Sequence, residues 1–129
     1  MKFINSPEAQ ALKLPFSQAV QVGDVLYLSG QLGNKPGTLE LVPGGMEAEA
    51  RQTMENIGAV LSENGLSFAD VFKVTVMLAD MAQWPAFNKV YVTYFDPARL
   101  PARSAFGCNG LALGAQVELE CAAYAGKAR

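Results

Sequence analysis

Histidine is absent from the 129-residue sequence, and this excludes several kinds of catalytic site at once. Ser-His-Asp and Cys-His nucleophile systems need an imidazole, and so does acid–base catalysis by paired histidines. A catalytic zinc site is disfavoured for the same reason. Any chemistry must therefore use carboxylates, Arg, Lys, Tyr, Ser, backbone groups or water.

Cysteine, basic runs and long apolar runs are also scarce. Cys108 and Cys121 lack metal-ligand spacing and are too few for a disulfide framework, so both are interpreted as buried small hydrophobic residues. The net charge is −2 and there is no basic run, which argues against a nucleic-acid partner. No apolar run approaches the roughly 20 residues of a membrane helix, and no signal peptide is visible. We expect a cytoplasmic protein with no membrane partner.

The composition is that of a compact globular chain. Half of the residues are hydrophobic and 17% are charged, and the length suits a single domain over residues 1–129. A domain of this size buries only about two thirds of its unfolded surface, which leaves apolar surface for a partner chain.

The first half of the chain predicts a hairpin and then a helix. Residues 16–22 and 25–32 flank a Gly-Asp turn signal, and 33–45 is expected to be a loop with a short strand over 38–42. From Met46 to Asn64 the apolar residues follow a helical period, and Asn64-Gly65 is a stop signal. The residues of the predicted apolar stripe are Met46, Ala50, Thr53, Met54, Ile57, Val60 and Leu61.

The second half predicts a strand, a helix and a final hairpin. In the strand 71–78, Phe72, Val74, Val76 and Leu78 are expected on one face. A helix follows Asp80 with Pro85 in its first turn, because proline lacks the amide proton that an interior turn needs. The strands 104–108 and 115–124 are expected to pair across a turn. A mixed sheet with two helices on one face is the economical arrangement, and its uncovered face argues for an oligomer.

Three charged residues lie on that last predicted hairpin: Arg103 stands at the mouth of its first strand, and Glu118 and Glu120 lie inside the second, where charge is unusual. Register arithmetic places Arg103 opposite a residue near 119 to 121, while Glu118 and Glu120 share a face. A guanidinium and one or two carboxylates are therefore expected in one patch. One interpretation is a structural ion pair. The other is a site for a small carboxylic acid, bound by the arginine and attacked by a water that a glutamate activates.

Several stretches together resemble the reactive intermediate deaminase family, also called the YjgF/YER057c/UK114 family. They are "PFSQAV", "LYLSGQLG", "QTMENIGAVLSENGLSFADVFKVTVMLADM", "FNKVYVTYF", "PARSAF" and "GAQVELECAA". The resemblance runs from about Pro15 to Ala123. It implies an α+β fold like that of a small chorismate mutase, with a mixed β-sheet and two helices packed on one face. It also implies a homotrimer with a central β-barrel and ligand clefts between subunits.

The resemblance further implies an activity that needs no cofactor and no metal. Members hydrolyse reactive 2-imino acids, or their 2-aminoacrylate enamine tautomers, to 2-keto acids and ammonia. Arg103 in "PARS" matches the arginine that anchors the substrate carboxylate, and Glu118 in "QVELE" matches the glutamate that handles the attacking water. Ser29, Gly30 and Asn88 match residues of the ligand cleft, whereas Glu120 is interpreted as structural.

Two positions differ from the commonest family pattern. Phe16 stands where a cleft tyrosine is usual, which removes one hydrogen bond worth about 0.5–1.5 kcal/mol. Ala105 stands where many members have a cysteine, although a backbone carbonyl there is kept. These two substrate-binding positions are where a difference in substrate preference or rate is expected.

Other functions remain open on the sequence alone. The same scaffold suits another aminoacrylate, such as one from pyrimidine breakdown. A trimeric module that binds small carboxylates or holds unfolded proteins is a second possibility, and its activity would persist without Arg103. An endoribonuclease is a third, disfavoured by the acidic composition and the lack of histidine.

Overall fold

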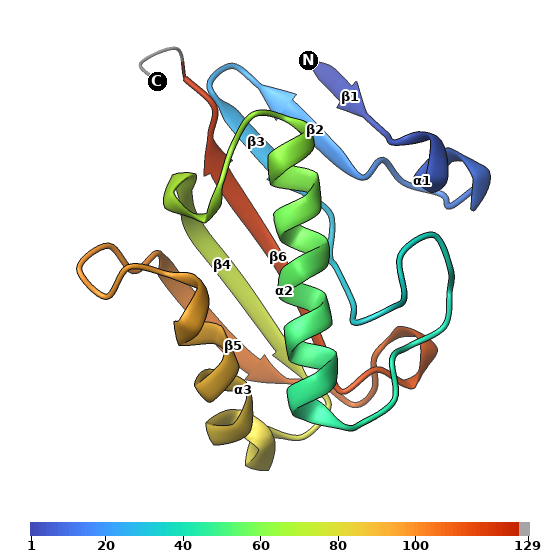
Figure 1. Cartoon of the computed structure of the whole chain (residues 1–129), viewed down its shortest axis with the longest axis vertical. Helices are drawn as coiled ribbons and strands as arrows, with labels where there is room; N and C mark the ends of the chain where they lie inside the picture. The colour runs from blue at the N-terminus through green and yellow to red at the C-terminus, as the bar shows by residue number, and fades with distance from the viewer. Residues whose placement is uncertain (127–129) are drawn as a thin grey trace.

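The computed structural model describes residues 1–126 as an α+β fold, in which one six-stranded sheet carries helices on one face (Figure 1). The strands are β1 (Lys2–Ile4), β2 (Ala19–Val22), β3 (Val25–Leu28), β4 (Val71–Leu78), β5 (Ala102–Gly107) and β6 (Val117–Tyr124). The helices are α1 (Pro7–Ala11), α2 (Met46–Glu63) and α3 (Trp84–Tyr91). In Figure 1, α2 lies across the sheet, α3 lies beside α2, and α1 lies near β1 and β2.

The strand order is β1-β2-β3-β6-β4-β5, and it contradicts one sequence prediction. The β2–β3 hairpin is confirmed, with Val22 paired to Val25. The predicted hairpin between the last two strands is wrong, because β4 lies between them. β5 pairs with β4 in parallel after the α3 crossover, and β6 pairs with β4 antiparallel. Parallel neighbouring strands need a crossover connection such as the one through α3, whereas a short turn joins antiparallel strands. The short sequence separation of β5 and β6 therefore did not mean that they pair.

The two faces of the sheet differ sharply. Side chains alternate between the faces along each strand, and directly paired residues share a face. The helix face is the buried side that packs under α2 and α3, and it includes Leu26, Val74, Val76, Val117 and Leu119. The open face is the opposite side. Its exposed large apolar residues are Phe3, Val22, Tyr27, Phe106 and Tyr124.

The helix over 46–64 is confirmed, and its predicted apolar stripe is buried. It starts after Gly45 at a φ of 82° and is followed by Gly65 at 74°, conformations that favour glycine. Glu49 falls outside the predicted apolar stripe, yet it is only 6% exposed. Its Oε1 accepts a hydrogen bond of 2.9 Å from the backbone N–H of Gln116, which explains how the carboxylate can be buried.

Three local expectations fail for identifiable reasons. A register shift between Val71 and Lys73 buries Val71 and leaves Phe72 46% exposed, the reverse of the predicted alternation. The short strand over 38–42 is absent, and an isolated bridge between Asn34 and Leu41 stands near it. β1 and α1 were not predicted. Within residues 1–126, no helix is both long and apolar enough to cross a membrane.

Candidate active site

Arg103 is fixed from one side by helix α3. It lies on β5 opposite Val74, whose side chain is in the buried core, so Arg103 points to the helix face. Its Nη1 donates a hydrogen bond of 2.8 Å to Oδ1 of Asn88. Ala105 is two residues further along β5 and lies on the same face, opposite Val76. Asn88, Arg103 and Ala105 form what we call the arginine half-site.

Within residues 1–126, no carboxylate neutralises this guanidinium. Among residues 1–126, ion-pair geometry is found between Lys89 and Glu47 on the surface, and no carboxylate lies within that range of Arg103. A half-buried guanidinium with an amide partner and no counter-ion is well suited to bind a carboxylate from outside the chain.

Glu118 lies on β6 and faces the other way. It pairs with Met77 of β4. Met77 alternates along β4 with the buried Val76 and Leu78, so Met77 and Glu118 both point to the open face. Burial raises the pKa of its carboxyl above the ordinary value, and the charge of Glu120 raises it further. A carboxylate with a raised pKa is a stronger base than an ordinary glutamate and therefore a better proton acceptor.

The carboxylate of Glu118 rests directly against Gly30. A Cβ added at Gly30 would stand 2.9 Å from the Glu118 carboxyl carbon and closer still to its Oε2. Only a residue without a side chain leaves the carboxylate in this position, which explains the glycine in "SGQ".

Ser29 and Phe16 complete the same neighbourhood. The Ser29 hydroxyl donates a hydrogen bond of 2.6 Å to the Ser17 carbonyl, which ties the start of the "SGQ" stretch to the segment that carries Phe16. The Phe16 side chain is 54% exposed. Phe16, Ser29, Gly30 and Glu118 form what we call the glutamate half-site.

The two half-sites are on opposite faces of the sheet. The expectation that Arg103 and the glutamates share one patch is therefore wrong within a single chain. It assumed a β5–β6 hairpin, whereas β4 separates these strands and the alternation along each one sends Arg103 and Glu118 apart. The seven predicted site residues divide into two groups, and one chain does not bring the groups together.

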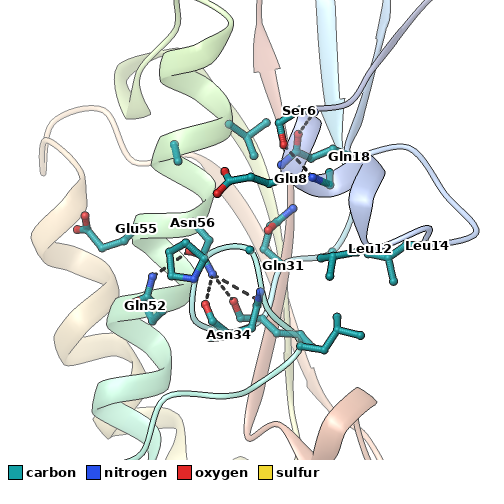
Figure 2. Close-up of a pocket in the computed structure, with 18 of the residues that line it drawn as sticks. Ser6, Glu8, Leu12, Leu14, Gln18, Gln31, Asn34, Gln52, Glu55 and Asn56 are labelled. Atoms are coloured by element: carbon teal, nitrogen blue, oxygen red, sulfur yellow. Dashed lines mark hydrogen bonds between the residues drawn. The ribbon is translucent and has the colours of Figure 1, made fainter.

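A large cavity lies elsewhere, between α1, α2 and the segment 30–39 (Figure 2). Its volume is about 650 Å³, and Phe16 and Gly30 reach its wall, whereas Arg103 and Glu118 do not. Among residues 1–126, the lining includes Glu8, Glu55 and Glu63 and contains no lysine or arginine. Three carboxylates without a cation make it unsuited to an anionic substrate.

The segment beside this cavity is held by α2. The amide of Asn56 donates to the backbone carbonyls of Leu32 and Asn34, each at 3.0 Å. Figure 2 shows Asn56 beside Asn34. Gln52 in turn donates to Oδ1 of Asn56 at 2.9 Å. These bonds fix the segment that follows Gly30. Gln31 is also joined to Leu119 by two backbone hydrogen bonds. The helix thus holds Gly30 in register with the strand that carries Glu118.

Sequence reasoning missed the aromatic surroundings of Arg103. The guanidinium carbon lies 5.2 Å from the ring centre of Trp84 and 4.7 Å from that of Tyr91. Both rings lie on α3, the helix that also carries Asn88. Their spacing with Asn88 was the available signal, because positions 84, 88 and 91 fall on one face of a helix.

Comparison with known proteins places the chain in a family. The family model described as "Endoribonuclease L-PSP" matches residues 4–125, and the chain belongs to this family. The mouse protein named 2-iminobutanoate/2-iminopropanoate deaminase is 44% identical over 125 residues, which cover 97% of this chain and 92% of the mouse protein. A chloroplastic Reactive Intermediate Deaminase A from Arabidopsis thaliana is 38% identical, over 93% of this chain and 64% of that one.

Solved structures agree with the fold. RidA from the Antarctic bacterium Psychrobacter sp. PAMC 21119 superposes with a TM-score of 0.87 at 39% identity, covering 96% of this chain and 99% of that one. A protein from Thermotoga maritima described as a putative endoribonuclease has a TM-score of 0.88 at 35% identity, covering 98% and 99%. The mixed α+β architecture is therefore that of the family.

Proposed function

We propose that this protein hydrolyses reactive 2-imino acids, or their 2-aminoacrylate enamine tautomers, to 2-keto acids and ammonia. Family membership supports the proposal, as do relatives with 38–44% identity that are named 2-iminobutanoate/2-iminopropanoate deaminase. The observation that carries it is an Arg103 guanidinium with no carboxylate partner among the described residues of its own chain. Small dissolved substrates also fit the cytoplasmic location that the sequence favours.

The complete site forms between chains in a homotrimer. One chain contributes its arginine half-site and a neighbour contributes its glutamate half-site. This arrangement follows from the opposite directions of Arg103 and Glu118, which leave each chain with half of the machinery. The exposed apolar residues of the open face, such as Tyr27 and Phe106, supply the surface that such an assembly would bury.

The reaction needs only a bound carboxylate and a positioned water. Arg103 binds the substrate carboxylate through its planar fork of N–H donors. Glu118 of the neighbouring chain accepts a proton from water as the water oxygen bonds to the imine carbon. Glu118 returns this proton to the imine nitrogen, which gives a carbinolamine. The hydroxyl proton of the carbinolamine then moves to the amine as the C–N bond breaks, which releases ammonia and the 2-keto acid. Acid–base assistance of this kind contributes about 10²–10⁴-fold.

The test generates the imine beside the protein. An amino-acid oxidase or threonine dehydratase supplies the imine, and semicarbazide traps what remains. Wild-type protein should suppress the semicarbazone signal, whereas Arg103→Ala and Glu118→Gln should not. Folding of both variants is checked by circular dichroism and by size-exclusion chromatography. A folded Arg103→Ala variant with the wild-type rate would remove Arg103 from the site.

Two other functions predict different outcomes in the same assay. If imines derived from Ala, Ser and Thr are all left untouched, a carboxylate-binding module becomes the better description. The family description names an endoribonuclease, so RNA cleavage is measured in parallel. Cleavage that persists in the Arg103→Ala variant would separate that activity from the site described above.

A further inference from the structure

One face of α3 surrounds the Arg103 side chain with three neutral groups. Trp84, Asn88 and Tyr91 are spaced by four and then three residues, so they lie on a single helical stripe. Asn88 accepts from Nη1 at 2.8 Å, and the two ring centres lie 5.2 Å and 4.7 Å from the guanidinium carbon. Both aromatic distances are within the range of a cation–π contact.

These partners attract the cation without supplying a negative charge. An indole and an amide cannot ionise at physiological pH. Tyr91 stays neutral as well, because burial raises its pKa to about 12 even though the nearby Arg103 charge opposes the rise. A carboxylate in the same place would hold the guanidinium more strongly, but it would then compete with the carboxylate of a substrate.

We propose that Trp84 and Tyr91, together with Asn88, are positioning residues that hold the Arg103 guanidinium in place and leave its charge free for a substrate carboxylate. The inference rests on the proposed function, because it assumes that Arg103 binds the substrate. It adds that α3 preorganises this arginine, so that less conformational freedom is lost when the substrate binds.

Tyr91 illustrates that the ring is what matters. Its hydroxyl is buried and has no hydrogen-bond partner of acceptable geometry within the described residues, so the side chain contributes mainly its aromatic face. Tyr91→Phe keeps that face and removes the unpaired hydroxyl. It should therefore affect KM less than loss of an aromatic ring at this position would.

The decisive variant is Asn88→Asp. It preserves shape and places a negative charge at the atom that now accepts from Arg103. The fold should persist, because the new contact is an ion pair. KM for the imine should rise by at least about tenfold, since charged pairs at this range couple strongly, while kcat changes little. Binding of pyruvate, the simplest 2-keto acid, should weaken by a similar factor in a calorimetric titration.

Trp84 is tested by a matched pair. Trp84→Leu removes the ring and should raise KM about 2- to 30-fold, the range expected for one cation–π contact. Trp84→Phe keeps an aromatic face and should restore most of the affinity. Phe68→Leu removes a partly buried ring that stacks on Tyr94 and Phe95 instead, and it controls for a general loss of packing.

The outcomes separate this inference from the proposed function. If the wild-type protein deaminates imines and Asn88→Asp and Trp84→Leu retain the wild-type KM and pyruvate affinity, the positioning role is wrong and the function stands. If the wild-type protein neither deaminates imines nor binds pyruvate, the proposed function fails and this inference fails with it. If Phe68→Leu raises KM as much as Trp84→Leu does, the effect is loss of packing and the inference is overturned.

Discussion

Replacing Gly30 by alanine should disable Glu118 without unfolding the protein. The added Cβ would stand 2.9 Å from the carboxyl carbon of Glu118 and 3.3 Å from its Cγ. Carbon atoms in comfortable contact are about 3.5–4.0 Å apart, so the carboxyl carbon must withdraw by about 0.6–1 Å. The atoms in the way belong to the end of a flexible side chain, and the backbone at Gly30 is outside the left-handed region. The cost in stability should therefore be under about 1 kcal/mol.

The cost in activity should be much larger. A displacement of about 1 Å in a group that positions or activates a reactant can cost on the order of 100-fold in rate. We expect Gly30→Ala to lower kcat by about 10- to 100-fold in the semicarbazide assay. The melting temperature, followed by circular dichroism, should stay near the wild-type value.

Gly33→Ala provides the opposite pattern. A Cβ there would lie 2.6 Å from the backbone carbonyl oxygen of Glu49 in α2, and the backbone of a packed helix cannot move aside as a side chain can. We expect a loss of about 1–3 kcal/mol in stability, with near-normal activity per folded molecule. The reasoning is refuted if Gly30→Ala keeps the wild-type kcat while Glu118→Gln loses it, because Glu118 would then act from another position.

Two further predictions concern ionisation. If Glu118 is the general base, activity must fall as the pH drops through its raised pKa. Glu120→Gln removes the like charge that helps to raise this pKa, so the acidic limb of the kcat/KM profile should move to lower pH. An unchanged profile would show that another group controls this limb. Burial raises the pKa of the Cys121 thiol to about 12, so a thiol reagent at pH 8 should modify Cys108 in the native protein and both cysteines after denaturation.

Local patterns predicted α2, α3 and the first hairpin well. The apolar period from Met46 to Leu61 and the stop at Asn64-Gly65 depend on neighbours within one or two turns, so α2 could be identified from the sequence. The Val22–Val25 turn is likewise a local feature. Pro85 in the first turn of α3 was predicted for the same reason.

The order of the last strands could not be obtained in this way. β5 and β6 follow one another in the sequence, yet each pairs with β4 and not with the other. This order places β4 between two strands, and its residues Val74, Val76 and Leu78 are buried. A bulge at Phe72 similarly depends on the partner strand, which alternation alone does not reveal. These non-local pairings decide the face on which Arg103 and Glu118 emerge, so the site residues were predictable by type but their arrangement was not.

The division of the site between faces makes a quantitative prediction about mixed assemblies. Arg103→Ala and Glu118→Gln should each be inactive alone, because every interface lacks one partner. If the protein assembles as the proposed cyclic trimer, equal amounts that are unfolded together and refolded give about three quarters of trimers with both variants, and each of these has one interface that joins an intact Arg103 to an intact Glu118. The mixture should therefore regain about one quarter of the wild-type activity, whereas simple mixing of preformed trimers should regain little. A site formed within one chain would yield no recovery, since each chain would still carry its own lesion.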